Sequence, residues 1–248
     1  MFDLITIALI AGTFLLAGTV KGVIGLGLPT VSLGLLAATL DLTSAMALLL
    51  IPSFATNLWQ AVVGGNGGAI LRRLWPFFVL ATATVWLGAM ALTRVDRSLL
   101  SGLLGGLLMA YATLGLAGIR WVISAQQEIW AGPLFGGLNG IFTGMTGSFA
   151  VPGVLFLQAL GLTRDMLVQA MGILFTVSTL ALALYNNSLL TTRLSVLSVA
   201  AVLPAVLGML IGQGIRQQLS EVRFRQIFFI ALFILGGYII MQSVISAS

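Results

Sequence analysis

The chain has 248 residues, of which 59% are hydrophobic and 7% charged, and its mean hydropathy is +1.14. A soluble domain carries roughly a quarter charged residues, so this composition excludes an aqueous fold and predicts helices that span a bilayer. The sequence has no histidine and no cysteine, which removes the usual metal ligands and nucleophiles, so we expect no cofactor, no metal and no enzymatic activity. The net charge of +5 comes from arginines scattered through short loops, so no nucleic-acid partner is expected.

Charges and Gly, Pro or Asn breaks divide the chain into ten apolar segments. Most of them approach the 20 or so residues that a helix needs to cross the hydrocarbon layer. The second, sixth and seventh segments are too short for a full crossing. The first segment lacks the basic start and the cleavage site of a signal peptide, so we expect it to be retained. The segments are 4–20, 28–40, 44–63, 74–93, 98–119, 129–143, 149–160, 166–186, 194–213 and 226–246.

The two halves of the chain resemble each other at a nearly constant spacing. Leu40-Asp41-Leu42-Thr43 recurs as Leu160-Gly161-Leu162-Thr163, and Leu87-Gly88 as Leu207-Gly208, both 120 residues later. Gly18 and Lys21-Gly22 meet Gly136 and Asn139-Gly140 at a spacing of 118 residues. A common spacing indicates an internal duplication, which is frequent in transporters.

We therefore predict an all-α polytopic membrane protein made of two homologous halves, 1–125 and 126–248. Each half has a broken or re-entrant helix pair, 4–40 or 129–160, followed by three spans. If each pair enters and leaves by one face, the second half is inverted relative to the first. This arrangement places seven of ten arginines inside, against six for a parallel one, so the positive-inside rule slightly favours inverted repeats.

The run from Gly18 to Thr30 contains four glycines and a proline, which make a continuous lipid-facing helix improbable. A break at Gly25 to Gly27 would leave a helix starting near Pro29, whose first N–H groups suit an anion. Lys21 is the only lysine of the chain. It is either a cation inside the bundle or an anchor at the interface, and composition leaves the two interpretations open.

The run from Asn139 to Pro152 repeats this punctuation in the second half. Its hydroxyl groups, on Thr143, Thr146 and Ser148, can donate to an oxyanion. Gly140 and Gly144 are four residues apart, so they can instead serve close helix packing, and both roles are compatible.

The remaining polar residues within spans are Asn57, Gln60 and Gln169. They either line a pore or hydrogen-bond neighbouring helices. All six carboxylates lie at segment ends, so the sequence offers no candidate for a proton relay.

The two glycine-rich runs resemble the signature of the sulfite exporter TauE/SafE family of bacterial membrane permeases. The first run has Gly18, Gly22, Gly25, Gly27 and Pro29, and the second extends from Gly136 to Pro152. Ser148-Phe149-Ala150-Val151 stands where the family pattern has more glycine and proline. The resemblance implies transport of small sulfur-containing or carboxylate anions across a bacterial inner membrane, and it supports Lys21 as a site residue.

We predict a multi-pass transporter of small anions such as sulfite, thiosulfate or sulfonate, working by alternating access, with a site near the midplane where the two broken elements meet. Its expected partners are the lipid bilayer, the small anion and possible further copies of the chain. The alternatives are an anion channel and a non-transporting membrane scaffold. The candidate substrate-binding residues are Lys21, Gly22, Gly25, Gly27, Pro29, Thr30, Asn57, Gln60, Asn139, Gly140, Thr143, Gly144, Thr146, Gly147, Ser148 and Gln169.

Overall fold

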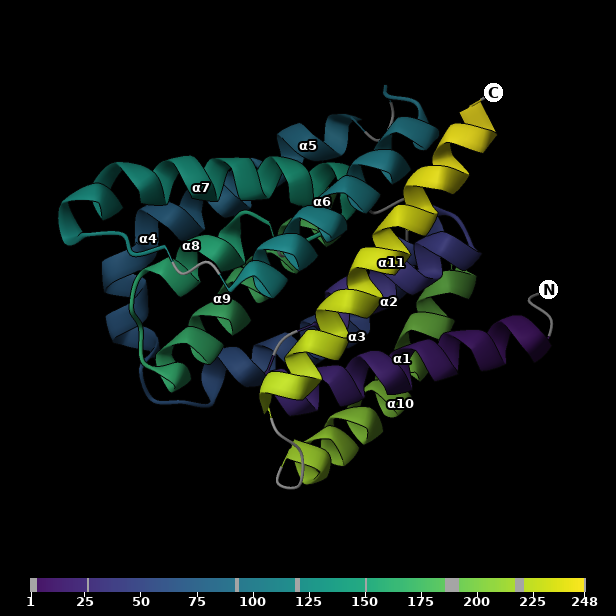
Figure 1. The fold of residues 1–248 in the computed structure, drawn as a ribbon, viewed down its shortest axis with the longest axis horizontal. Helices are drawn as coiled ribbons and strands as arrows, with labels where there is room; N and C mark the ends of the chain where they lie inside the picture. The colour runs from purple at the N-terminus through teal and green to yellow at the C-terminus, as the bar shows by residue number, and fades with distance from the viewer. Residues whose placement is uncertain are drawn as a thin grey trace. The chain divides into compact units, whose positions relative to one another are not determined.

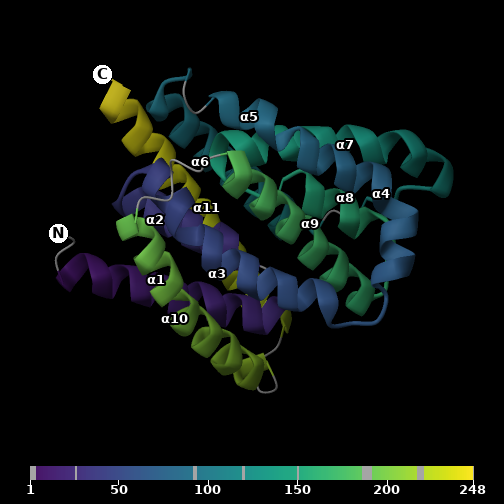
Figure 2. The same ribbon diagram turned by 180° about the vertical axis from the view of Figure 1, so that it is seen from behind.

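The computed structural model describes residues 4–25, 27–91, 94–118, 121–149, 151–185, 192–216 and 221–247. In these residues every regular element is an α-helix (Figures 1 and 2). The elements are α1 (Leu4–Ile24), α2 (Leu28–Thr39), α3 (Leu42–Val62), α4 (Gly67–Ala83), α5 (Val85–Ala91), α6 (Arg97–Ala117), α7 (Ala125–Thr146), α8 (Gly153–Ala159), α9 (Arg164–Tyr185), α10 (Thr192–Arg216) and α11 (Glu221–Ala247).

Within the described residues, seven helices are long and apolar enough to cross a membrane, which confirms the predicted all-α polytopic membrane protein. One of them runs through both α4 and α5. The helix α7 is not in this set although it has 22 residues, because glycines and polar side chains dilute its apolar ones. The spans are Leu4–Ile24, Leu42–Val62, Gly67–Ala91, Ser98–Ala117, Asp165–Tyr185, Leu194–Ile215 and Arg225–Ile245.

Several helices begin earlier than the apolar segments predicted, and the difference is four residues or more for α4, α7 and α11. The helix α7 starts at Ala125 rather than at 129, because Ser124 and Gln127 form a capping box that carries the helix through a polar first turn. The helix α4 starts at Gly67 rather than at 74, which places Arg72 and Arg73 inside it. Segment ends at 92–93, 119 and 186 lie outside the described residues.

The chain forms two compact units, and each unit draws on both halves of the sequence. The first comprises Met1–Pro52, Ser101–Ala117 and Ser188–Ser248, and so contains α1, α2, α10 and α11. The second comprises Ser53–Leu100 and Gly118–Asn187, and so contains α4, α5 and α7 to α9. The predicted halves 1–125 and 126–248 describe the sequence and do not coincide with these units.

In the first unit, α1 and α10 pack backbone against backbone, as Figure 1 shows. A Cβ atom at Gly18 would overlap the carbonyl of Ala205, and one at Gly22 would overlap the carbonyl of Met209. Gly208 and Gly212 of α10 face α1 in the same way. The successive contacts show that the two helices run in the same direction and that glycine sets their close approach.

In the second unit, α7 packs in the same manner along α4 and α5 (Figure 2). A Cβ atom at Gly136 would overlap the carbonyl of Phe77, and one at Gly140 would meet the carbonyl of Ala81 at 2.6 Å. Gly144 continues this row against Val85. The chain thus repeats one glycine-packed helix pair in each unit.

These contacts correct part of the sequence comparison. The contact between Gly18 and Ala205 in the first unit is equivalent to the contact between Gly136 and Phe77 in the second. This equivalence matches each residue of α1 with the residue 118 positions later in α7, and each residue of α4 with the residue 128 positions later in α10. A spacing of 128 residues also matches Pro76 with Pro204. It does not match Leu87-Gly88 with Leu207-Gly208, which are 120 residues apart. The α1–α7 spacing of 118 residues, which aligns Lys21 with Asn139, agrees with the packing.

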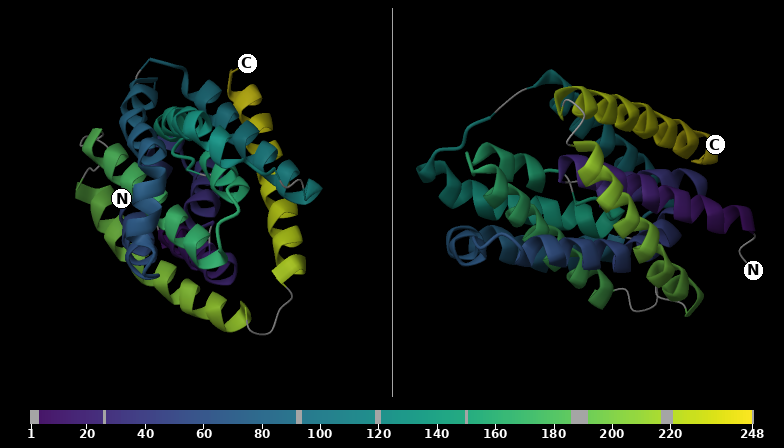
Figure 3. Two further views of the ribbon diagram at one scale, coloured as in Figure 1. Left: turned by 90° about the vertical axis from the view of Figure 1, so that its left-hand side faces the viewer. Right: turned by 90° about the horizontal axis from the view of Figure 1, so that it is seen from below.

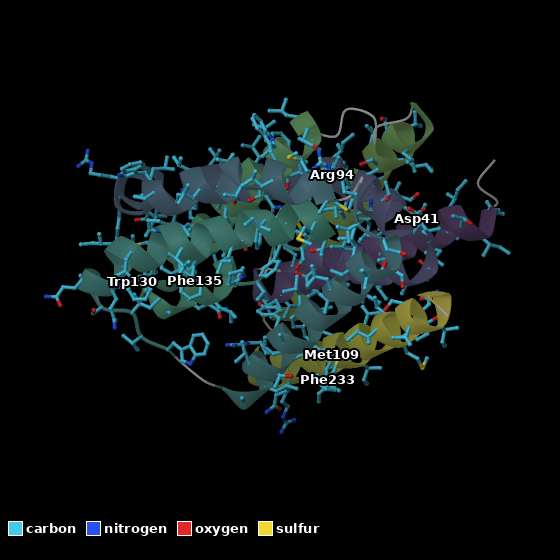
Figure 4. The ribbon with its side chains drawn as sticks, turned by 90° about the horizontal axis from the view of Figure 1, so that it is seen from above. Asp41, Arg94, Met109, Trp130, Phe135 and Phe233 are labelled. Carbon is cyan, nitrogen blue, oxygen red and sulfur yellow. The ribbon has the colours of Figure 1, made fainter. Side chains whose placement is uncertain are left out.

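The first unit is completed by α2, α6 and α11 (Figure 3). A Cβ atom at Gly105 of α6 would meet the carbonyl of Gly236 of α11 at 2.7 Å, so this pair is also backbone-close. Figure 4 shows Met109 of α6 beside Phe233 of α11. The helix α2 packs on both α1 and α11.

The helix α3 contains Pro52, which lacks the N–H that would bond the carbonyl of Leu48. Ser198 of α10 replaces that donor, because its hydroxyl donates to the Leu48 carbonyl at 2.8 Å and accepts from the N–H of Ile51 at 3.3 Å. A side chain from the second half of the sequence therefore completes the backbone hydrogen bonding of a span in the first half.

Candidate functional site

The first interrupted element, residues 18–30, breaks where the glycine pattern predicted. The helix α1 ends at Ile24 and α2 begins at Leu28. Gly25 and Gly27 between them have φ angles of 80° and 111°, which L side chains rarely adopt. No side chain caps α2, so the backbone N–H groups of its first turn have no side-chain cap, and Pro29 contributes none because it has no N–H.

Lys21 lies in the last turn of α1, and only 3% of it is exposed. A cation in this position is costly unless its surroundings compensate the charge. Thr30, in the first turn of α2, is also buried, with 4% exposed. The sequence left two interpretations of Lys21 open, and its burial inside the first unit favours the interior cation over the interfacial anchor.

The second interrupted element, residues 139–153, is a tight re-entrant turn. Gly147 ends α7 with a φ of 72°, the peptide bond between Val151 and Pro152 is cis, and α8 begins at Gly153. The N–H of Ile123 donates to the carbonyl of Ala159 at 2.9 Å, which joins the end of α8 to the segment just before α7. The chain thus returns toward the end from which it entered, as a re-entrant pair requires.

Among the described residues, two buried donors at this turn have no hydrogen-bond partner. Asn139 accepts the N–H of Gly153 at 2.9 Å through its Oδ1, but its Nδ2 donates to none of these residues. The Ser148 hydroxyl also has no partner among them, and 1% of Ser148 and none of Asn139 is exposed. Buried donors are almost always satisfied in native proteins, so these two are the candidates at this turn for contact with a bound acceptor.

The two threonines of this element use their protons on the backbone. Thr143 donates to the carbonyl of Ser148 at 3.0 Å, and Thr146 donates to the carbonyl of Phe142 at 2.7 Å. Because a hydroxyl has one proton, neither threonine has a donor left for an anion in this structure. Of the three hydroxyl groups predicted to donate, Ser148 alone remains available.

The candidate glycines divide into two groups. Gly22, Gly140 and Gly144 face the backbone of neighbouring helices, so the structure assigns them to packing. Gly25, Gly27 and Gly147 instead adopt left-handed conformations at the two breaks. Only this second group shapes the interrupted elements.

The polar residues of α3 and α9 hold helices together. The Gln60 amide donates to the carbonyl of Val168 at 2.7 Å, and the Gln169 amide donates to the carbonyl of Ala61 at 2.8 Å. Asn57 donates to Ser53 within α3 at 2.9 Å. For the two glutamines the structure supports the alternative of interhelical hydrogen bonding over pore lining.

Sequence reasoning missed Ser178 of α9, which is fully buried and whose hydroxyl has no partner. It lies one turn beyond Leu174, which approaches Gly153, and three residues beyond Phe175, whose ring lies 5.9 Å from that of Phe149. It is therefore close to the second interrupted element. A serine between Thr176 and Thr179 in an apolar segment gave no signal, because such residues usually bond their own helix, as both threonines do.

Seven apolar spans with interrupted helices and buried, unpartnered donors define a polytopic membrane transport protein. The family model of the sulfite exporter TauE/SafE matches residues 10–239, so the chain belongs to this family. It is a multi-pass membrane transporter that contacts lipid and carries a small substrate. The chain matches no curated protein and no solved structure.

Proposed function

We propose that this transporter carries small sulfur-containing or organic anions, such as sulfite, thiosulfate or sulfonates, across a bacterial inner membrane by alternating access. The observation that carries the proposal is the pair of unpartnered donors, Asn139 Nδ2 and Ser148 Oγ, at the second interrupted element. The buried ammonium of Lys21 and the uncapped start of α2 supply the donors of the first.

The chemistry of these groups fits an oxyanion. An anion that leaves water must regain hydrogen bonds, and amide, hydroxyl, backbone N–H and ammonium groups are all donors to oxygen. Every hydrogen bond to an anion is charge-assisted, and in the bond from Lys21 the donor is charged as well, so Lys21 is expected to contribute most to affinity. The family to which the chain belongs supports the sulfur-containing class.

Ligand-dependent thermal unfolding in detergent tests the substrate class. Sulfite, thiosulfate, sulfonates and carboxylates are compared with sulfate at equal ionic strength, since selective binding stabilises the folded state by about 2.7 kcal/mol at a hundred times Kd. We expect stabilisation by one or more of the sulfur or carboxylate anions. Stabilisation by none of them would contradict the proposal.

Anion flux into proteoliposomes tests the mechanism. A carrier shows saturation, and its flux rises when the same anion is present on the opposite side, whereas a channel shows no such trans-stimulation. A Lys21→Ala variant that leaves anion flux intact while it disrupts a partner complex would favour the scaffold.

The prediction that both interrupted elements serve one anion is tested by a double-mutant cycle. Lys21→Met and Asn139→Leu are combined, and anion affinity is measured for both single variants and the double variant. Residues that bind the same ligand couple, so the two losses are expected not to add. Strict additivity would separate the elements into independent sites.

A further inference from the structure

The second unit contains a cavity of about 380 Å³ between the N-terminal halves of α4 and α7, lined by no residue of the 139–153 element. Its volume lies within the range of small-molecule sites, which is about 300–1,000 Å³. Its walls are apolar apart from one ion pair, and they come only from these two helices. The lining residues are Arg73, Leu74, Pro76 and Phe77 of α4, and Ala125, Glu128, Ile129, Gly132 and Pro133 of α7.

The cavity lies where α4 is irregular and where α7 carries a glycine followed by a proline. In α4 the backbone of Leu74 is non-helical, with φ −111° and ψ 16°, two residues before Pro76. In α7, Gly132 leaves space that a side chain would fill, and Pro133 follows it. The close backbone packing of α7 on α4 through glycines begins only at the contact between Gly136 and Phe77.

An ion pair stands in the wall of this cavity. Arg73 donates to Glu128 through Nε at 2.8 Å and through Nη2 at 2.7 Å, and the two side chains are 44% and 12% exposed. A guanidinium has five N–H donors and a carboxylate about four acceptor positions, so this geometry leaves three donors and two acceptor positions unused. A cation and an anion side by side, each with hydrogen-bonding positions still unused, complement the two charges of a zwitterion.

The surroundings indicate that the zwitterion is a lipid. Trp75 of α4 and Trp130 of α7 are 61% and 60% exposed, and Figure 4 places Trp130 near the start of α7. Exposed tryptophans near the ends of spans are typical of the membrane–water interface, where phospholipid headgroups lie. An ion pair and an apolar cavity at that level match a headgroup and the acyl chain below it.

We propose that this cavity binds a phospholipid with a primary ammonium headgroup, of the phosphatidylethanolamine type. The phosphate accepts from the unused N–H groups of Arg73, and the ammonium donates to Glu128. A choline headgroup has no N–H for Glu128, and a purely anionic headgroup leaves the carboxylate opposite a negative charge. The site therefore prefers ethanolamine to both choline and glycerol headgroups.

Lipid competition on the intact protein tests the proposal. The purified chain is placed in nanodiscs of phosphatidylcholine that contain equal small amounts of phosphatidylethanolamine and phosphatidylglycerol, and the retained lipid is quantified by native mass spectrometry. We expect about tenfold enrichment of phosphatidylethanolamine over phosphatidylcholine, the effect of one charge-assisted hydrogen bond. No enrichment, or enrichment of phosphatidylglycerol instead, would overturn the proposal.

Variants locate the preference. Glu128→Gln should abolish the discrimination between ethanolamine and choline, and Arg73→Gln should reduce retention of both. Arg72→Gln is the matched control, since Arg72 is exposed and does not line the cavity, and it should behave as the parent protein. Undiminished preference in Glu128→Gln would contradict the proposed contact.

A further variant keeps the ion pair and fills the cavity, which guards against loss of folding in the charge variants. A Cβ atom at Gly132 would make only ordinary contacts, the nearest at 3.7 Å to Phe156, and the cavity of about 380 Å³ that Gly132 lines offers room for the rest of the side chain in Gly132→Leu. Leucine also favours the helix by up to about 1 kcal/mol over glycine. Lipid enrichment should fall while thermal stability in detergent is kept, and retained enrichment would show that the lipid binds elsewhere.

Discussion

The two interrupted elements share one architecture but differ in the groups that they bury. Both begin on a glycine-packed helix, α1 or α7, and both end it with a left-handed glycine. At corresponding positions, however, the first carries the ammonium of Lys21 and the second the amide of Asn139. The two elements therefore share their packing and differ in the polar residue that they bury.

The turn of the second element is held by side-chain hydrogen bonds, since the N–H of Gly153 donates to Asn139 and Thr143 donates to the carbonyl of Ser148. At the first break, the start of α2 has no side-chain cap. In the proposed anion site, the first element would supply the charge and the second a fixed set of neutral donors. A change at Lys21 should therefore affect affinity most, and a change at the second element should affect it less.

The largest effect is expected for Lys21→Met, which keeps the side-chain length and removes the charge. Hydrogen bonds to charged groups contribute about 1.5–3 kcal/mol, so anion affinity should fall by roughly 100-fold. Anion uptake into proteoliposomes measures it. The control is Ser32→Ala, which removes a buried hydroxyl bonded to Leu28 in α2 and should retain uptake. Normal uptake by Lys21→Met would contradict the proposal that the charge of Lys21 contributes to anion binding.

The next effect is expected for Asn139→Asp. The substitution keeps the oxygen that accepts from Gly153 and replaces the unpartnered amide with a second oxygen, so an anion loses a donor and meets an acceptor. Affinity should fall by about tenfold or more, measured by the ligand-dependent thermal shift. In the control Asn57→Asp, the Ser53 hydroxyl can turn to donate, so affinity should stay the same. Equal losses of affinity in both variants would show that the added negative charge, and not the loss of the Asn139 amide, weakens anion binding.

Glycine packing should prove equivalent in the two halves. Gly22→Ala and Gly144→Ala place a Cβ atom against backbone and should each destabilise the protein by about 1–3 kcal/mol in thermal unfolding. The controls Gly12→Ala and Gly137→Ala lie on the same two helices with open space or a contact at 4.0 Å, and should be neutral or stabilising by up to about 1 kcal/mol. If only one of the two test variants were destabilised, the packing would not be equivalent.

The smallest effect is expected for Ser148→Ala, which removes a buried hydroxyl without a partner. Anion affinity should fall by about tenfold, the loss of one hydrogen bond to a charged acceptor at the lower end of its range of about 1.5–3 kcal/mol. Thermal stability without anion should stay the same or rise, because the hydroxyl pays its desolvation cost in the empty protein. Thr146→Val, which loses a bond to Phe142, should show the opposite pattern of lower stability. Reduced stability in Ser148→Ala would show that this hydroxyl is structural.

The helical class and the first break followed directly from the sequence. Glycines at 25 and 27 and proline at 29 have strong conformational preferences, so they determine local structure with little help from neighbours. The start of α7 was harder to predict, because a capping box through Ser124 and Gln127 overrides the hydropathy that places a boundary at Glu128.

The roles of individual polar residues depended on tertiary contacts. Gln60 and Gln169 are 109 positions apart in the chain, and nothing in either segment shows that each bonds the backbone of the other's helix. The hydroxyl of Thr143 looked like an anion donor until the turn brought the Ser148 carbonyl to it. Residue type predicts what a group can do, and the fold decides which of its partners is within reach.

The bond from Ser198 to Leu48 has a consequence for biosynthesis. When a ribosome has delivered the chain only through α6, Pro52 has already removed one donor from α3, and the hydroxyl that replaces it has not yet been made. The glycine face of α1 also has no partner helix until α10, which packs on it, has been synthesised. The first unit can close only after almost the entire polypeptide has entered the membrane, so a nascent chain stalled before α10 carries an unsatisfied carbonyl and an open helix face.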